Sequence, residues 1–189
     1  MSHQTVCVSA DEALKILKKG NEDYVTSLKT GDFSAERRKE TVSAQQPYAV
    51  VITCSDSRVV PESVFSAGIG DIFVIRVAGN VIDDHQLGSI EYAASHLGCE
   101  LVVVMGHTHC GAVTAAIEHD PDGYIKYITD EIKQAIGSER DPVKAAELNV
   151  ARSISIIERS LEIQSLESSE GLRIVGAMYN IESGRVRFM

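Results

Sequence analysis

A short stretch at positions 54–58 places a thiol, a carboxylate and a guanidinium on alternate residues. Cys54, Asp56 and Arg58 follow directly on an apolar run at 48–53. In an extended chain, alternate side chains project to the same side, so all three would face one region. A thiolate can bind a metal ion, and an arginine paired with an acid can hold the carboxylate as a hydrogen-bond acceptor. The pattern favours metal chemistry beside a fixed acid, and it leaves a simple turn with a surface ion pair as the alternative.

A second stretch, 106–111, adds a further thiol and two imidazoles. Two thiolates and one imidazole are a zinc ligand set, and three protein ligands leave a fourth position for water, as in catalytic zinc sites. His107 lies three residues before Cys110, a separation that a tight turn can fold around one ion. His109 is adjacent to Cys110 and is the less favoured ligand, because its side chain would turn away. We therefore predict a Zn²⁺ site of Cys54, His107 and Cys110 for hydrolytic or hydration chemistry.

The remaining cysteines and histidines have simpler interpretations. Cys7 and Cys99 have no polar company, so we expect them to be buried apolar residues. His85, His96 and His119 are expected at the surface or at helix caps, with proton relay to solvent as the alternative role.

Four apolar runs predict the strands that position these groups. They are rich in Val and Ile and lack polar alternation, which is typical of strands buried on both faces of a parallel sheet. The runs are 48–53, 72–77, 101–105 and 173–179. Cys54 and Cys110 each fall just after one of them, and ligands of open α/β sheets bind at the carboxyl ends of strands.

Helical patterns separate these strands. They cover 9–28, with Ser9 as N-cap, 86–97, with Gly98 as the stop, a segment starting near Ala112, 124–136 and 142–165. Segments 173–180 and 185–189 predict a hairpin. The order of elements predicts an α/β fold: a mostly parallel central sheet flanked by helices, with a C-terminal hairpin at the sheet edge. We expect a single domain, 1–189, in which a helical arm, 1–46, precedes a zinc-binding core, 47–189.

Composition excludes several partners. The 189 residues carry a formal net charge of −9, which argues against nucleic acid or an anionic membrane surface. The longest apolar runs are far below the roughly 20 residues that span a bilayer. The N-terminus lacks a basic segment followed by an apolar one, and the cysteine spacing is not that of a disulfide scaffold. We therefore expect a reducing, cytoplasmic setting.

Four motifs together resemble the β-class carbonic anhydrases. They are Cys54-Ser-Asp56-Ser-Arg58, Arg76-Val-Ala-Gly-Asn80, Gly88-Ser-Ile-Glu91-Tyr92 and Gly106-His107-Thr-His-Cys110-Gly111. The resemblance runs from about residue 45 to 111. It implies reversible hydration of carbon dioxide to bicarbonate and a proton, by attack of a zinc-bound hydroxide oriented by Asp56 and Arg58. It also implies a homodimer or a dimer of dimers, with an N-terminal arm that embraces a neighbour and active sites at the dimer interface.

The finer likeness is to the plant-like branch, whose metal site is constitutively open. It implies that Gln45, Phe73, Tyr92 and Gly111 form the substrate pocket, with Gln45 as a donor to substrate oxygen and Phe73 as an apolar wall. Ala78 stands where that branch usually has a larger aliphatic residue, which predicts a wider pocket.

Two other functions remain as alternatives. The same scaffold can hydrolyse carbonyl sulfide or carbon disulfide, which are linear like carbon dioxide. A zinc-stabilised regulatory protein without catalysis would instead require a fourth protein ligand.

Overall fold

The computed structural model describes residues 8–27 and 30–189, so the predictions for Cys7 and for the end of the first helix at Leu28 lie outside the described residues. The strands are β1 (Ala49–Thr53), β2 (Ile72–Arg76), β3 (Leu101–His107), β4 (Arg173–Tyr179) and β5 (Val186–Phe188). The helices are α1 (Ala10–Thr26), α2 (Ala35–Glu40), α3 (Pro61–Val64), α4 (Asp84–Leu97), α5 (Gly111–Glu118), α6 (Ile125–Ile136), α7 (Pro142–Ile157) and α8 (Leu161–Ser169), with a 3₁₀ turn η1 (Ala78–Asn80).

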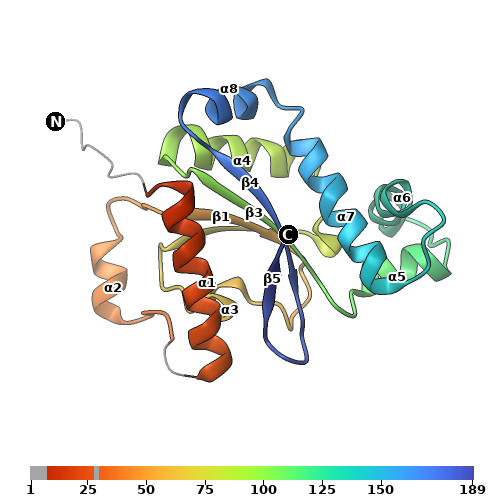
Figure 1. Cartoon of the computed structure of the whole chain (residues 1–189), viewed down its shortest axis with the longest axis horizontal. Helices are drawn as coiled ribbons and strands as arrows, with labels where there is room; N and C mark the ends of the chain where they lie inside the picture. The colour runs from red at the N-terminus through yellow and green to blue at the C-terminus, as the bar shows by residue number, and fades with distance from the viewer. Residues whose placement is uncertain (1–7, 28–29) are drawn as a thin grey trace.

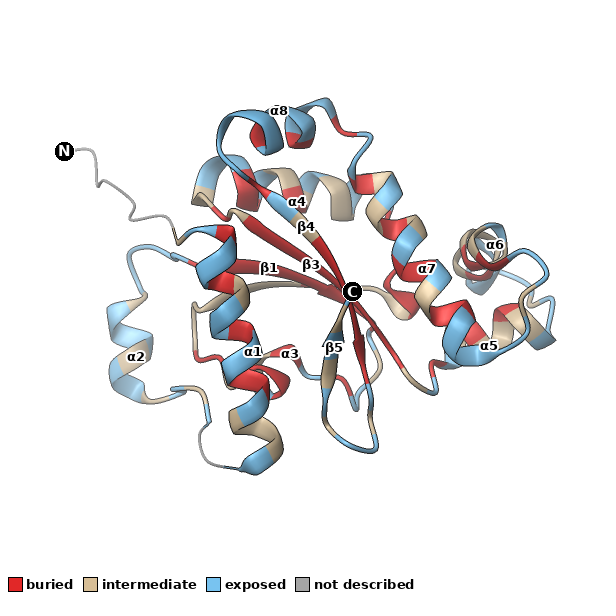
Figure 2. Cartoon of the chain, viewed as in Figure 1, coloured by how far each residue is buried: buried red, intermediate tan, exposed pale blue. Residues whose placement is uncertain are grey.

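The strands form one sheet in the order β2-β1-β3-β4-β5, and the first four are parallel. Only β5 runs antiparallel, as the second strand of a hairpin with β4. Every residue of β1 and β3 is buried (Figure 2). The two central strands are covered on both faces, which explains their unbroken apolar sequences. The α/β fold with a mostly parallel sheet and a C-terminal hairpin is confirmed.

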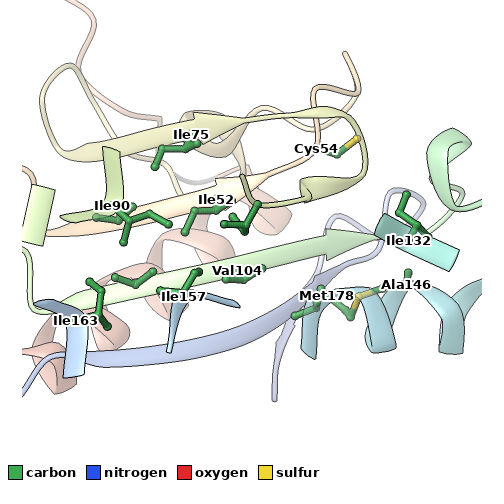
Figure 3. Packing of buried hydrophobic residues seen from close by; sticks show 14 of the residues in the cluster. Ile52, Cys54, Ile75, Ile90, Val104, Ile132, Ala146, Ile157, Ile163 and Met178 are labelled. Carbon is green, nitrogen blue, oxygen red and sulfur yellow. The ribbon is translucent and has the colours of Figure 1, made fainter. Parts of the chain in front are cut away.

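Helices cover the two faces of the sheet unequally (Figure 1). One face packs against α4, α5, α6, α7 and α8, and the other against α1 and α3. Figure 3 shows the larger cluster, with Ile90 and Ile163 at one end and Ile132 and Ala146 at the other. Within the described part of the chain, no helix is both long enough and apolar enough to cross a lipid bilayer.

The ends of α4 show how local sequence sets an element. At the helix start the Asp83 carboxylate accepts from backbone N–H groups of the first turn, and the Gln86 side-chain oxygen accepts from the Asp83 backbone N–H, which makes a capping box. Gly98 ends the helix in the left-handed conformation with φ 70°, as its position in the sequence predicts. The helix lies where the periodicity predicts it, and its first turn starts two residues earlier.

One predicted helix is divided in the structure, and the arm contains a further short helix. The pattern at 142–165 is two helices, because the chain turns at 158–160 and the Ser160 hydroxyl caps α8 at Ile163. The polar segment 31–46 contains the short helix α2, which has no buried residue. The Arg37 side chain ties it to the body through the Ile69 carbonyl and the Asp71 carboxylate.

Helix α1 packs against the sheet of its own chain. Ala13 and Leu17 are fully buried on its inner face. The amide of Asn21 donates to the carbonyls of Val64 and Gly184, and its oxygen accepts from the backbone N–H of Val186. One side chain thus joins the first helix to α3 and to the C-terminal hairpin. Contact of this arm with a second chain stays a prediction.

Replacing Asn21 with alanine is expected to lower the free energy of unfolding by about 2–4 kcal/mol, because three backbone groups lose their partner. Urea denaturation measures this loss. Glu22→Ala, an exposed change at the next position, is the control and should stay within about 0.5 kcal/mol of the parent protein. A loss in the Asn21 variant no larger than in the control would show that α1 does not depend on this contact.

Candidate metal centre

Three side chains that can bind a metal meet at the carboxyl end of the sheet. Cys54 follows β1, His107 is the last residue of β3, and Cys110 is the N-cap of α5. Figure 3 shows Cys54 just beyond the strand end. All three residues are buried, and their ligand atoms lie within 4.8 Å of one another. Strand β3 is two residues longer than the sequence predicts, and this extension carries His107 to the site.

The spacing of the two sulfurs fits zinc. Two zinc–sulfur bonds of about 2.3 Å at a tetrahedral angle separate the sulfurs by about 3.8 Å. The Sγ atoms of Cys54 and Cys110 are 4.0 Å apart. A metal ion of this kind could therefore be bound by both sulfurs with little movement of the chain.

The His107 ring is oriented as a metal ligand would be. Its Nδ1 lies 2.9 Å from the Thr108 carbonyl oxygen, which can only accept, so the proton belongs on Nδ1. Nε2 then carries a lone pair, and this buried atom has no hydrogen-bond partner among the described residues. A buried, unpaired nitrogen is costly unless something binds it. His109, in contrast, is exposed, and its backbone is left-handed with φ 57°.

The two thiols influence each other's ionisation. The hydrogen bond with Cys110 lowers the pKa of the Cys54 thiol, against the opposing effect of burial. The same contact, together with burial, raises the pKa of the Cys110 thiol. One proton is therefore shared between the sulfurs, and a divalent cation between them would replace it.

Asp56 and Arg58 form a close ion pair within a turn. The Asp56 Oδ1 accepts from the Arg58 backbone N–H at 2.9 Å and from Nε at 3.0 Å, while Oδ2 accepts from Nη2 at 2.7 Å. These arginine hydrogen bonds hold the pKa of the Asp56 carboxyl well below its usual range. Oδ1 thus uses both of its acceptor sites, whereas Oδ2 keeps one free.

The extended geometry expected for 54–58 is wrong. The Val59 backbone N–H donates to the Asp56 carbonyl, so the chain turns at 57–58. A local Asx-type hydrogen bond favours this turn over a straight strand. The bidentate pair forms nevertheless, since the turn brings the guanidinium back to the carboxylate.

Two arginines connect the loops of the site. Arg58 Nη2 also donates to the His109 carbonyl at 3.1 Å and so joins the two ligand-bearing loops. Arg76, at the end of β2, donates to the carbonyls of Cys54 and Asp56 at 3.2 and 2.8 Å. Arg76 stood in the motif of the sequence resemblance, but no role was assigned to it. Its contacts fix the backbone from which both functional side chains project.

The predicted substrate residues fall into two groups. Gly111 directly follows Cys110 at the start of α5, beside the candidate centre. Phe73 pairs with Val50 of β1 in the sheet. Val50 lies four residues before Cys54, so Phe73 is about 13 Å from the end of the sheet that carries Cys54. The Tyr92 ring lies 6.3 Å from the Phe73 ring, between ring centroids. Within one chain, therefore, this aromatic pair lies away from the metal ligands.

Gln45 belongs with the aromatic pair. It lines an open cavity of about 630 Å³ between the segment after α2 and the end of α4, together with Tyr92 and His96. The His96 ring contacts the edge of the Tyr92 ring. His85, His96 and His119 are all exposed, and Cys99 is buried, as their sequence contexts predict.

The fold and this centre define an α/β protein with a candidate Cys-His-Cys metal site. Comparison with known proteins identifies its family. Residues 49–186 match the family described as carbonic anhydrase. "Carbonic anhydrase 2" of Mycobacterium tuberculosis is 38% identical, over 92% of this chain and 89% of that protein. The chain therefore belongs to the carbonic anhydrase family, in its β class.

Solved structures agree with this assignment. The β-carbonic anhydrase CafA of Aspergillus fumigatus is 29% identical and has a TM-score of 0.77, with 82% of this chain and 80% of that chain covered. One of two tetrameric β-carbonic anhydrases from Sordaria macrospora has a TM-score of 0.74 at 24% identity, over 82% and 89% of the two chains. The second likeness bears on the fold alone.

Proposed function

We propose that this protein hydrates carbon dioxide reversibly to bicarbonate and a proton, with Zn²⁺ held by Cys54, His107 and Cys110. The convergence of their three ligand atoms carries the proposal. Zinc in such a site supplies Lewis-acid activation of water near neutral pH. The group has three members among the described residues, and the Asp56 carboxylate is not one of them. Three protein ligands suit a catalytic site better than a structural one.

Asp56 would orient the attacking water. Its carboxylate is ionised at neutral pH, as an aspartate ordinarily is, and the Arg58 hydrogen bonds lower its pKa further. Arg58 occupies both acceptor sites of Oδ1, which leaves Oδ2 to accept a hydrogen bond from water. Arg58 also limits rotation of the carboxylate, and Arg76 holds its backbone. A water fixed by one hydrogen bond would keep an oxygen lone pair directed at the carbon of carbon dioxide.

We further propose that a second chain completes the substrate pocket. Gln45, Phe73 and Tyr92 lie together but away from the metal ligands of their own chain. Strand β2, which carries Phe73, is at the edge of the sheet, where another chain can approach. A homodimer, or a dimer of dimers, would bring the aromatic pair of one protomer to the centre of its partner.

Stopped-flow hydration of carbon dioxide, with zinc measured on the same sample, tests the proposal. The rate is expected to rise in proportion to the zinc content, because the metal supplies the activated water. Removal of zinc with a chelator should abolish the activity, and added zinc should restore it. Fully zinc-loaded protein that fails to hydrate carbon dioxide at any pH would overturn the proposal.

The same preparation separates the alternatives. Faster turnover of carbonyl sulfide or carbon disulfide than of carbon dioxide would assign the site to those substrates. A cobalt-substituted sample without an exchangeable water would support a non-catalytic zinc protein. We expect neither result, and we propose a reducing, cytoplasmic setting, which suits the unoxidised thiols of Cys54 and Cys110.

A further inference from the structure

The turn η1 supplies a backbone hydrogen bond to one of the candidate metal ligands. The Gly79 N–H donates to the Cys54 sulfur at 3.2 Å. Gly79 and Asn80 are both left-handed, with φ of 68° and 44°, a combination that is unfavourable for L-residues. A Cβ on Gly79 would lie 2.7 Å from the Ile132 Cδ1 and 3.1 Å from the Ala112 Cβ, so a larger residue would also have to displace the Ile132 side chain. A turn of this kind needs support from outside its own residues.

Two buried polar side chains on α7 give that support. The Asn149 Nδ2 donates to the Gly79 carbonyl at 2.6 Å, and the Ser153 hydroxyl donates to the Asn80 carbonyl at 2.9 Å. Each side chain belongs to a residue that is only 2% exposed. They are four residues apart and so share one face of the helix. Together they bind both left-handed residues of the turn.

Helix α7 is itself closely packed on the sheet beside these contacts. A Cβ on Gly106, in β3, would lie 2.8 Å from a methyl carbon of Val150, and a Cβ on Gly176, in β4, would lie 3.2 Å from another. The two glycines therefore let α7 approach β3, the strand that ends in His107, and its neighbour β4. Asn149, next to Val150, cannot shift without moving this packed helix.

We infer that Asn149 and Ser153 are positioning residues for the metal centre: they hold η1 so that the Gly79 N–H stays on the Cys54 sulfur. This deepens the proposed function and rests on it. A hydrogen bond to a thiolate withdraws electron density from the sulfur. It also fixes the orientation of the cysteine side chain. Cys54 would thus donate less charge to the metal than an unbonded thiolate and would be preorganised to bind it.

Cobalt substitution tests this inference without relying on activity. Asn149→Leu is similar in size but cannot donate, so the turn should relax and the sulfur should lose its hydrogen bond. The sulfur-to-cobalt charge-transfer absorption is expected to move to longer wavelength, because an unbonded thiolate is more easily oxidised. Metal affinity, measured by competition with a chelator, is expected to fall about 10-fold. Ser153→Ala, a milder change, should shift the absorption in the same direction by less.

Thr129→Val is the matched control. Thr129 is buried on α6, a helix that also contacts η1, but its hydroxyl bonds to carbonyls of its own helix. This variant should keep the parent absorption and affinity. If the parent protein binds cobalt while Asn149→Leu and Ser153→Ala keep the parent absorption, the inference is wrong and the proposed function stands. If the parent protein binds neither zinc nor cobalt, the proposed function itself fails.

Discussion

Replacing Cys110 with alanine is expected to release the metal and to abolish hydration of carbon dioxide. The change removes one of the three proposed ligands, and the remaining sulfur and nitrogen would hold a divalent ion less firmly. Even partners that only orient a ligand are worth about 10–100-fold in metal affinity, so loss of a ligand should cost more than this. Equilibrium dialysis against zinc, followed by stopped-flow hydration, measures both effects.

Cys99→Ala is the matched control for this variant. Cys99 is also a buried thiol of the same core, but it lies before β3, at the opposite end of the strand from His107. It should retain full zinc content and full activity. Equal zinc binding by the Cys110 variant and the parent protein would remove Cys110 from the ligand set.

Replacing Asp56 with asparagine is expected to keep the metal and to lose at least about 100-fold in turnover, a loss typical of a positioned acid or base. An amide presents one oxygen and one NH₂ group where the carboxylate presents two acceptors. Whichever way it is oriented, the NH₂ group faces a donor of Arg58. The acceptor that Oδ2 offers to water is then lost or misdirected, while Cys54, His107 and Cys110 are unchanged.

Stopped-flow kinetics with zinc content on the same sample distinguish this effect from metal loss. Glu131→Gln is the control, because it neutralises the acid of another ion pair, with Arg152, between α6 and α7. That variant should hydrate carbon dioxide at the parent rate. Near-parent turnover in the Asp56 variant would show that its carboxylate does not orient the water.

The strands were predictable because strands buried on both faces appear in the sequence as continuous apolar runs. Strands β1 and β4 lie within one residue of their apolar runs, since both are composed almost entirely of side chains that cannot face water. The break between α7 and α8 was not predicted. Apolar residues keep helical spacing across it, and neither glycine nor proline marks the turn, so only the Ser160 cap signals it.

The site was predictable as far as its residue types carry the chemistry. Thiols and an imidazole after buried strands indicate a metal site, and the structure brings Cys54, His107 and Cys110 together. The support from Asn149 was not predictable, because it depends on how closely α7 lies on the sheet. The available signal was an asparagine within an apolar helical pattern. That signal does not indicate that its partner is Gly79, 70 residues earlier.

The Asn21 contact has a consequence for the order in which the chain can fold during synthesis. Its partners include Gly184 and Val186, more than 160 residues later, so the first helix is made long before its final hydrogen bonds can form. A chain that emerges from the ribosome N-terminus first must hold this segment without its contacts to the hairpin until synthesis ends. The Asn21 bond to Val64 can form early, whereas its two bonds to the C-terminal hairpin require residues made at the end of synthesis.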